Sequence, residues 1–206
     1  LFGADVGHVR QAMASDHRIG SAFLFPGVGY GGSCFPKDIK ALVKFAESRG
    51  YSSEILRSVE QVNQKQKLRL VEKICDRFGQ NNLKGKRFGI WGLAFKPRTD
   101  DMREAPSIVI VNSLIEYGAE IVAYDPEAET SARRIFGDTI NLVKSSYDVL
   151  DGADALIVVT EWNEFREPDF DRMRKLMRNP IIFDGRNLFN VEQMKAQGFE
   201  YISIGR

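Results

Sequence analysis

The chain has 206 residues, of which 43% are hydrophobic, and its 29 basic and 28 acidic residues leave a formal net charge of +1. This length allows one large domain or two smaller ones with real cores. The balanced charge gives no electrostatic reason to expect a nucleic-acid or membrane partner, and no apolar run approaches the length of a membrane span.

The two cysteines, Cys34 and Cys75, lie far apart and form no CxxC spacing. This pattern argues against a disulfide scaffold and against a structural zinc site, so we predict no metal and take the cytoplasm as the default location. The chain begins at Leu1, without a methionine and directly in a helix-like pattern. We therefore expect further sequence on its N-terminal side.

Helical periodicity dominates the first part of the chain. Apolar spacing predicts a helix within residues 4–16, with Asp5 as its cap, and a second over 36–50 with Pro36 at its first position. A third helix is predicted over residues 53–78, where one side is apolar along the whole length. A helix this long typically joins domains or packs against a second subunit; the alternative is a surface helix that covers the core.

After Lys84, strand-like and helical runs alternate. A helical run, SIVIVNSLIEYGA, and further helical segments separate five apolar runs, KRFGIWGL, EIVAYDP, ALIVVT, PIIFDGR and YISIG, the last of which we expect at a sheet edge. This rhythm predicts an α/β fold in which a helical part, residues 1–84, precedes a doubly wound, Rossmann-like parallel sheet, residues 85–206. Ligands of such sheets bind at the carboxyl ends of the strands.

Residues 27–38, GVGYGGSCFPKD, contain the spacing GxGxxG of dinucleotide-binding loops. In such loops a helix opens within the glycine run, whereas here Pro36 would fall inside that helix. The preceding FLF is also too short to serve as the first strand of a βαβ unit. The pattern thus argues against a dinucleotide site here and leaves a plain structural loop or a chemical role.

Cys34 carries the chemical interpretation of this loop. It precedes a predicted helix start, and Lys37 follows within one turn; both features favour a thiolate. Asp38, four residues after the cysteine, can exchange a proton or hold a water molecule. A cysteine protease would need a histidine base, and both histidines, His8 and His17, precede the cysteine in polar helical context. We therefore favour covalent catalysis of another kind.

A second group of candidate residues follows the first predicted strand. Lys96, Arg98 and Arg103 are three cations within eight residues, and Phe95 lies beside them. At the carboxyl end of a strand such cations suit phosphate binding, although a solvated charged loop is the alternative. Arg186 similarly follows a buried strand in FDGRN, which is a position typical of binding residues.

The stretches RIGSAFLFPGVGYGGSCFPKDIKAL and GLAFKPRTDDMREAPS, together with AYDP, TEWNEF and IFDGRN, resemble the UDP-glucose/GDP-mannose dehydrogenase family, in its UDP-glucose 6-dehydrogenase branch. The resemblance covers the whole chain. It implies an N-terminal NAD-binding domain that is absent here, a central helical and dimerisation domain, residues 1–84, and a C-terminal UDP-sugar-binding α/β domain, residues 85–206. It also implies oxidation of UDP-glucose to UDP-glucuronate with two NAD+ and one water, through a thiohemiacetal and a thioester on the nucleophile.

The same resemblance implies roles for individual residues. The catalytic residues would be Cys34 and Asp38, with Lys37 as a helper of the thiolate. The substrate-binding residues would be Arg18, Phe23, Gly27, Tyr30, Gly31, Phe95, Lys96 and Arg186, with Arg18 acting across a subunit interface. Arg103 would contact NAD, and the helix over residues 53–78 would form the core of a homodimer.

The chain departs from the family in one respect. The family's catalytic lysine and asparagine, and the threonine and glutamate of its cofactor domain, have no counterpart in this sequence. We therefore expect the chain alone to bind UDP or UDP-glucose without producing NADH. Two alternatives remain: a sibling enzyme that oxidises another nucleotide sugar such as GDP-mannose, or a non-catalytic UDP-sugar-binding and dimerisation module.

Overall fold

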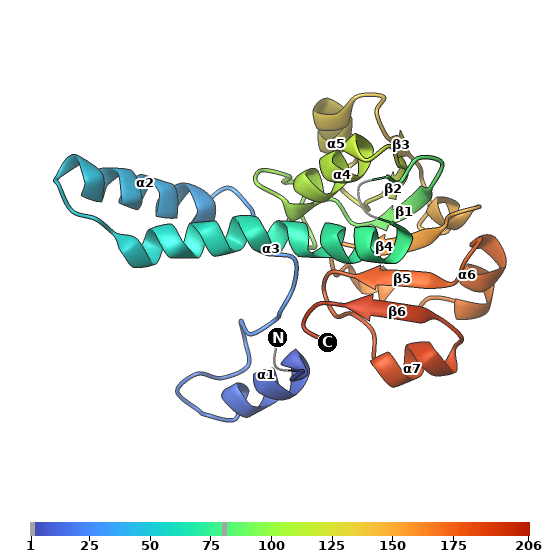
Figure 1. Ribbon diagram of the computed structural model, residues 1–206, viewed down its shortest axis with the longest axis horizontal. Coiled ribbons are helices and arrows are strands. Elements are labelled where there is room, and N and C mark those ends of the chain that lie inside the picture. Colours follow the sequence, from blue (N-terminus) through green and yellow to red (C-terminus); the bar gives the residue numbers. More distant parts are fainter. Residues whose placement is uncertain (1–2, 80–81) are drawn as a thin grey trace.

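The computed structural model describes residues 3–79 and 82–206. It comprises an α/β body, a helical hairpin that projects from this body, and a short N-terminal helix that lies apart from the hairpin (Figure 1). The described N-terminal segment and the C-terminus lie close together, because the Val6 amide donates a 2.9 Å hydrogen bond to the Gly205 carbonyl.

Three helices make up the first part of the chain: α1 (Val6–Ala14), α2 (Phe35–Ser48) and α3 (Glu54–Phe78). The side chain of Asp5 caps α1 by accepting a hydrogen bond from the Gly7 amide at 2.6 Å, as the sequence predicted. Pro36 lies in the first turn of α2, where its missing donor leaves no helical hydrogen bond unmade.

The 25 residues of α3 connect the hairpin to the body. Its N-terminal half pairs with α2 and exposes apolar side chains, with Ile55 80% and Val62 62% accessible. Its C-terminal half buries Leu70 and Ile74 completely in the core on one face of the sheet. The long helix predicted over residues 53–78 is therefore present and joins the two parts of the chain.

Six parallel strands form the sheet in the order β3-β2-β1-β4-β5-β6. They are β1 (Arg87–Trp91), β2 (Glu120–Tyr124), β3 (Asn141–Leu142), β4 (Ala155–Val158), β5 (Ile181–Asp184) and β6 (Glu200–Ser203). This order confirms the predicted doubly wound fold, with β6 at one edge. The chain winds outward from β1 to β3, returns to β4 and winds outward in the opposite direction.

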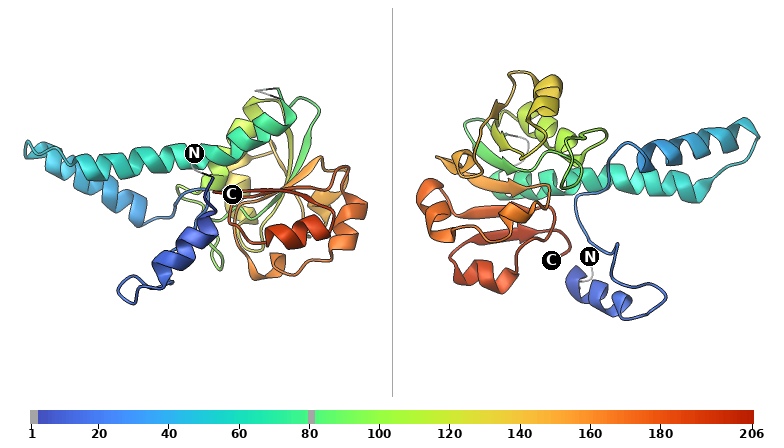
Figure 2. Two further views of the ribbon diagram at one scale, coloured as in Figure 1. Left: turned by 60° about the horizontal axis from the view of Figure 1, so that its bottom comes forward. Right: turned by 180° about the vertical axis from the view of Figure 1, so that it is seen from behind.

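Helices cover both faces of the sheet (Figure 2). One face packs against α3, α4 (Pro106–Glu116) and α5 (Glu129–Phe136). The other face packs against η1 (Asp148–Leu150), η2 (Asn163–Phe165), α6 (Phe170–Leu176) and α7 (Val191–Ala196).

Alternation along the strands explains the two cores. In β4, Ala155 and Ile157 belong to the cluster on the α4 face, whereas Leu156 and Val158 belong to the cluster on the α6 face. All four residues are buried, so the strand reads as a continuous apolar run, as expected of a strand covered on both faces.

The core on the α4 face extends beyond the sheet. Val28, Leu70 and Leu83 pack in the same cluster as the strand residues Phe88 and Ile157. Hydrophobic packing is therefore continuous across residues 84 and 85, and the division of the chain at that point stays a prediction.

Neither a membrane span nor a metal cluster is found in the described part of the chain. Across residues 3–79 and 82–206, no helix combines the length and the apolar character needed to cross a membrane. Within the same ranges, no group of three or more His, Cys, Asp and Glu side chains is placed to hold a metal ion.

Candidate functional site

The Gly-rich loop, residues 27–34, lies against a polar stretch of α3. The Asn63 side chain accepts a hydrogen bond from the Tyr30 amide at 2.8 Å and donates one to the Tyr30 carbonyl at 3.1 Å. The Gln66 amide donates to the Gly27 carbonyl at 2.7 Å. Two side chains on one face of α3 therefore pair with backbone groups of the loop, which has no partner strand of its own.

The same loop is bound to the carboxyl ends of the sheet at two places. The Val28 amide donates to the Gly185 carbonyl, just after β5, at 3.0 Å, and the Gly32 amide donates to the Arg103 carbonyl, in the loop after β1, at 2.8 Å. The loop thus bridges the hairpin and the edge of the sheet where ligands of doubly wound folds bind.

Glycine is required at two positions of the loop. Gly32 has a φ of +96°, and a Cβ atom there would lie 2.8 Å from the Phe95 ring. At Gly31, a Cβ would lie 2.4 Å from the Glu104 carbonyl oxygen. The glycines therefore allow close packing against the loop after β1. This packing explains the glycine-rich sequence without requiring that the loop bind a dinucleotide.

Cys34 occupies the N-cap position of α2 without a side-chain capping hydrogen bond, and it is exposed. The Asp38 amide donates to the Cys34 carbonyl at 2.9 Å, and the Ser33 hydroxyl lies 3.7 Å from the thiol sulfur. The Asp38 carboxylate lies 3.4 Å from the Lys37 ammonium, and both side chains are mostly exposed. The thiol, carboxylate and ammonium of the predicted catalytic group are therefore presented from one helix start.

Arg103, in the loop after β1, is held by an acidic neighbour. Its guanidinium makes two 2.9 Å hydrogen bonds to the Asp101 carboxylate. This pairing raises the pKa of Arg103, with a smaller contribution from the negative charge of a Cys34 thiolate, and lowers the pKa of Asp101. The loop that carries Arg103 therefore presents an exposed guanidinium that is held by Asp101.

Tyr30 is held between α2 and α3. Its ring packs edge-on against Phe35, with the ring centroids 4.7 Å apart, and its hydroxyl donates to the Glu60 carboxylate at 3.1 Å. Burial, followed by the negative charge of Glu60, raises the pKa of Tyr30 to about 12. The phenol is therefore a neutral hydrogen-bonding group at neutral pH.

A buried aspartate at the end of β2 fixes the loop that carries Phe95 and Lys96. The Leu93 and Ala94 amides donate to one Asp125 oxygen at 2.6 and 3.0 Å, and the Trp162 indole donates to the same oxygen at 3.2 Å. The ammonium of Lys96 lies 5.1 Å from the centre of the Phe95 ring. Asp125 therefore determines the course of the backbone immediately before these two predicted binding residues.

The carbonyl groups of this loop are also paired. The Ser107 hydroxyl donates to the Leu93 carbonyl at 2.5 Å, and the Thr160 hydroxyl, after β4, donates to the Ala94 carbonyl at 2.6 Å. The Phe95 amide donates to the Asp101 carbonyl at 3.1 Å. Residues 93–95 are consequently fixed by groups from β2, β4 and α4.

Arg186 lies at the end of β5, and a second buried aspartate positions it. Asp184 accepts hydrogen bonds from the Arg186 and Leu188 amides at 2.8 and 2.7 Å and from the Tyr201 hydroxyl at 2.8 Å. Burial raises the pKa of Asp184, whereas these hydrogen bonds lower it. The Arg186 guanidinium donates to the Glu161 carboxylate at 2.7 Å.

A cavity of about 450 Å³ opens beside Arg186. Its lining includes Phe25 and Pro26, which precede the Gly-rich loop, and four arginines against one carboxylate: Arg10, Arg166, Arg186, Arg206 and Glu161. Gly27 packs closely against one of these arginines, since a Cβ there would lie 2.7 Å from the Arg186 guanidinium. The excess of arginine makes this cavity suited to an anionic ligand.

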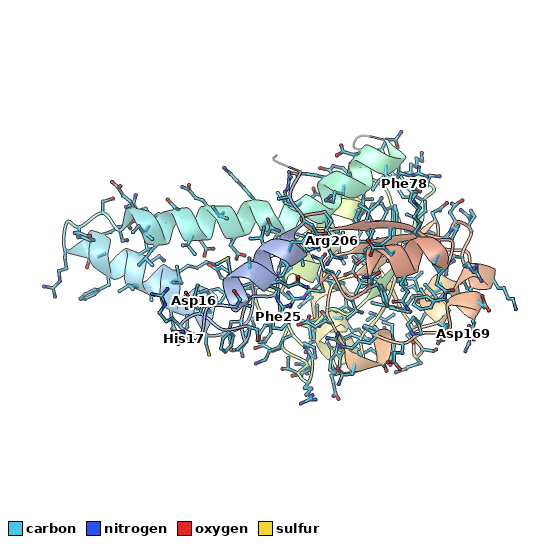
Figure 3. All side chains as sticks on the ribbon, turned by 90° about the horizontal axis from the view of Figure 1, so that it is seen from below. Asp16, His17, Phe25, Phe78, Asp169 and Arg206 are labelled. Carbon is cyan, nitrogen blue, oxygen red and sulfur yellow. The ribbon has the colours of Figure 1, made fainter. Side chains whose placement is uncertain are left out.

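Arg18 and Phe23 lie outside this arrangement. The Arg18 guanidinium pairs with Asp16 at 2.6 Å beyond the end of α1, and the Phe23 side chain is 96% exposed. Figure 3 shows Asp16 at the end of α1 that is remote from Arg206. Among the described residues, neither side chain is recorded in a hydrogen bond or ion pair with another predicted site residue.

The sheet of this chain does not fit a dinucleotide. The turn after β1 reads GLAF, with a single glycine, and its amides are directed at Asp125. In dinucleotide-binding sheets the acidic residue after the second strand instead binds a ribose hydroxyl. Here that carboxylate is already occupied, so the residues present offer no NAD site in this sheet.

The α3 residues Asn63, Gln66 and Lys67 were not identified from the sequence as part of the site. The groups that donate hydrogen bonds to Asp125 were not identified from it either. The three α3 residues follow a helical i, i+3, i+4 spacing and continue on the face that buries Leu70. A polar group on a face that is otherwise apolar is a signal that the sequence contains, and the pairing with the Gly-rich loop explains it.

The fold and the strand-end arrangement together define a doubly wound α/β protein with a cysteine-bearing loop against the sheet. Residues 89–191 match the model of the UDP-glucose/GDP-mannose dehydrogenase family, UDP binding domain, and residues 1–65 match the model of that family's central domain. The chain belongs to the UDP-glucose/GDP-mannose dehydrogenase family, which confirms the resemblance inferred from its motifs.

Individual relatives agree. A UDP-glucose 6-dehydrogenase from Pseudomonas aeruginosa is 46% identical over 211 residues, covering 100% of this chain and 46% of the relative. The UDP-glucose 6-dehydrogenase TuaD from Bacillus subtilis is 41% identical over 204 residues, covering 99% of this chain and 44% of the relative. The chain thus spans about half the length of the curated relatives it matches.

Solved structures show the same fold. A UDP-glucose dehydrogenase from Pyrobaculum islandicum superposes with a TM-score of 0.82 at 34% identity, covering 98% of this chain and 43% of that one. An NDP-N-acetyl-D-galactosaminuronic acid dehydrogenase from Methanosarcina mazei gives a TM-score of 0.82 at 27% identity, covering 99% of this chain and 44% of that one.

Proposed function

We propose that this chain supplies the nucleophile and the nucleotide-sugar site of an NAD-dependent enzyme that oxidises UDP-glucose to UDP-glucuronate. The observation that carries the proposal is the position of Cys34. It lies at a helix start, on a loop that bonds to the carboxyl ends of a sheet whose residues 89–191 match a UDP binding domain. The hydride acceptor would be NAD+, for which the sheet of this chain has no site.

In this proposal the C6 alcohol first loses a hydride to NAD+ and a proton, which gives the aldehyde. The Cys34 thiolate then attacks this aldehyde, and a new carbon–sulfur bond forms while the carbonyl pair becomes an alkoxide. Arg103, held by Asp101, would contact the NAD, as the resemblance implies. Loss of a second hydride, to a second NAD+, gives the thioester. Water then adds to the carbonyl carbon, the carbon–sulfur bond breaks to return the Cys34 thiolate, and the carboxylate is released. Asp38, one helical turn after the thiol, holds the water and takes its proton.

Substrate binding is assigned to two groups of residues. Phe95, Lys96 and the Gly-rich loop face the sugar and phosphates, while Arg186 and the arginine-lined cavity take the remaining negative charge. We also propose that α3 forms a homodimer contact through its exposed apolar side chains, and that Arg18 reaches the partner's site. The proposed location is the cytoplasm.

Titration of the chain with UDP-glucose by calorimetry tests the binding role. A few charge-assisted contacts at about 1.5–3 kcal/mol each, less the loss of ligand freedom, predict a Kd from high micromolar to millimolar. Lys96→Ala should weaken binding about tenfold, or about 1.4 kcal/mol. The matched control is Lys195→Ala, an exposed lysine on α7, which should bind as the wild type does.

Two results would contradict the proposal. One is the absence of UDP and UDP-glucose binding at several millimolar, and the other is equal weakening by both lysine variants. Tighter binding of GDP-mannose than of UDP-glucose would favour the sibling activity, since one solved relative of the fold is a GDP-mannose dehydrogenase from Pseudomonas aeruginosa.

A further inference from the structure

Lys67 is a fully buried lysine that the proposed reaction does not use. Its side chain is 2% exposed, in the middle of α3, whereas Lys65, two residues earlier on the same helix, is exposed. Burial of a charged ammonium is unfavourable unless the group is paired and hydrogen-bonded. A side chain in this position therefore has a specific partner.

The partner is the loop that carries Arg103. The Lys67 ammonium donates to the Glu104 carbonyl at 3.1 Å and lies 3.7 Å from the Glu104 carboxylate. That carboxylate also accepts a 2.5 Å hydrogen bond from Lys40 of α2, which lies 3.9 Å from Glu60 of α3. Burial lowers the pKa of Lys67, while the charges of Glu104 and Glu60 raise it.

The residue that Lys67 holds is conformationally unusual. Glu104 has a φ of +56°, in the left-handed region that residues other than glycine seldom adopt. Its backbone connects the Arg103 carbonyl, which accepts from the Gly32 amide, to the Glu104 carbonyl, which packs against Gly31. The conformation of one residue thus sets the contact between the two loops of the site.

The Gly-rich loop touches the Lys67 side chain as well. A Cβ at Gly29 would lie 3.3 Å from the Lys67 Cγ, so the loop passes directly over the aliphatic stem. The stem supports the Gly-rich loop and the ammonium supports the Arg103 loop.

We infer that Lys67 is a positioning residue. By holding the Glu104 carbonyl, it fixes the Gly-rich loop, which ends at Cys34, against the loop that carries Arg103. Without the ammonium this carbonyl loses its donor, and Glu104 relaxes toward an ordinary conformation. The Arg103 carbonyl then turns away from the Gly32 amide. Fixing the two loops preorganises the Cys34 thiol and the Arg103 guanidinium, and this consequence rests on the proposed function. The order of the two loops is measurable without a substrate.

Amide hydrogen exchange of a Lys67→Met variant tests this inference. Methionine keeps an unbranched stem and removes the charge, and Lys65→Met is the matched control on the same helix. We expect residues 29–34 and 102–105 to exchange at least about tenfold faster in Lys67→Met, while β1 and β4 stay as protected as in the wild type. The control should match the wild type throughout.

A folded Lys67→Met protein whose two loops exchange at the wild-type rate would overturn the inference. So would a uniform acceleration that includes β1 and β4, because it would mark Lys67 as a general stability residue. If Lys67→Met does not fold, Lys67→Arg carries the test, since it keeps a buried cation. It should then protect both loops to within about threefold of the wild type, and freely exchanging loops in the folded arginine variant would contradict the role.

Discussion

Replacing Asp125 with alanine removes the carboxylate on which three segments of the site converge. Oδ2 accepts from the Leu93 and Ala94 amides and the Trp162 indole, and Oδ1 accepts from the Glu127 and Ala128 amides, which makes five donors in all. Asp125 is itself 5% exposed.

The expected loss of unfolding free energy follows from these contacts. A hydrogen bond to a charged group contributes about 1.5–3 kcal/mol, and a buried donor left without a partner costs about 1–3 kcal/mol. Water entering the space left by the carboxylate satisfies part of the five donors, so the sum is not fully realised. We expect Asp125→Ala to lower the free energy of unfolding by about 3–5 kcal/mol, a large part of the roughly 5–15 kcal/mol typical of a domain.

Urea denaturation followed by tryptophan fluorescence measures this change, and Trp162 reports on the site because its indole donates to Asp125. The control is Asp138→Ala, an exposed aspartate after α5, which should stay within about 0.5 kcal/mol of the wild type. If the two variants differ by less than about 1 kcal/mol, Asp125 does not hold the loop as described.

Three further predictions concern the thiols, the assembly and pH. A thiol-reactive reagent should label Cys34, which is exposed, faster than Cys75, which is buried; peptide mapping with the opposite order would count against an accessible nucleophile. The chain should sediment as a dimer or larger at micromolar concentration, with Arg18→Ala weakening UDP-glucose binding but not stability; a strictly monomeric profile would refute the homodimer proposal. The pKa of Glu104 is lowered, chiefly by Lys40, so its contribution is present above its unfolded pKa of about 4.3 and is lost as pH falls through the lower folded value. The free energy of unfolding should therefore decrease less steeply with falling pH, below a pH of about 4.3, in Glu104→Gln than in the wild type. Identical acid profiles of the two proteins would show that the pairing of Glu104 does not contribute to stability.

Much of the fold was predictable because its signals are local. Pro36, Gly50 and the apolar spacing between them mark α2, and the four buried residues of β4 read directly as a strand. Helix α2 begins one residue earlier than predicted, at Phe35. Strand β3 was not predicted, since it has only two residues, Asn141 and Leu142, and owes its conformation to pairing with β2.

The motifs of the site were predictable from the sequence, but the contacts that hold these motifs in place were not. Cys34, Phe95 and Lys96 belong to short stretches whose chemistry shows in the sequence, and the fold places these stretches at one edge of the sheet. The pairing of Lys67 with Glu104 joins residues 37 positions apart, and no local pattern specifies it. The positive φ of Glu104 is likewise invisible in a sequence that has no glycine there.

The roles assigned to Arg18 and Phe23 came from the resemblance and not from a local pattern. Both side chains are exposed, so within one chain they have no packing reason to lie at the site. The assignment of Arg18 depends on a second subunit, and the sedimentation experiment tests that requirement first.

The central claim is that Cys34 is the nucleophile of a nucleotide-sugar oxidation. The most direct measurement is the formation of NADH and UDP-glucuronate from UDP-glucose by a Cys34→Ser variant of this chain joined to the NAD-binding domain that the resemblance implies. Serine keeps the size and position of the side chain but is a poor nucleophile and a poor leaving group, so the variant should form no free acid at a measurable rate. Undiminished production of NADH and UDP-glucuronate by Cys34→Ser would contradict the account.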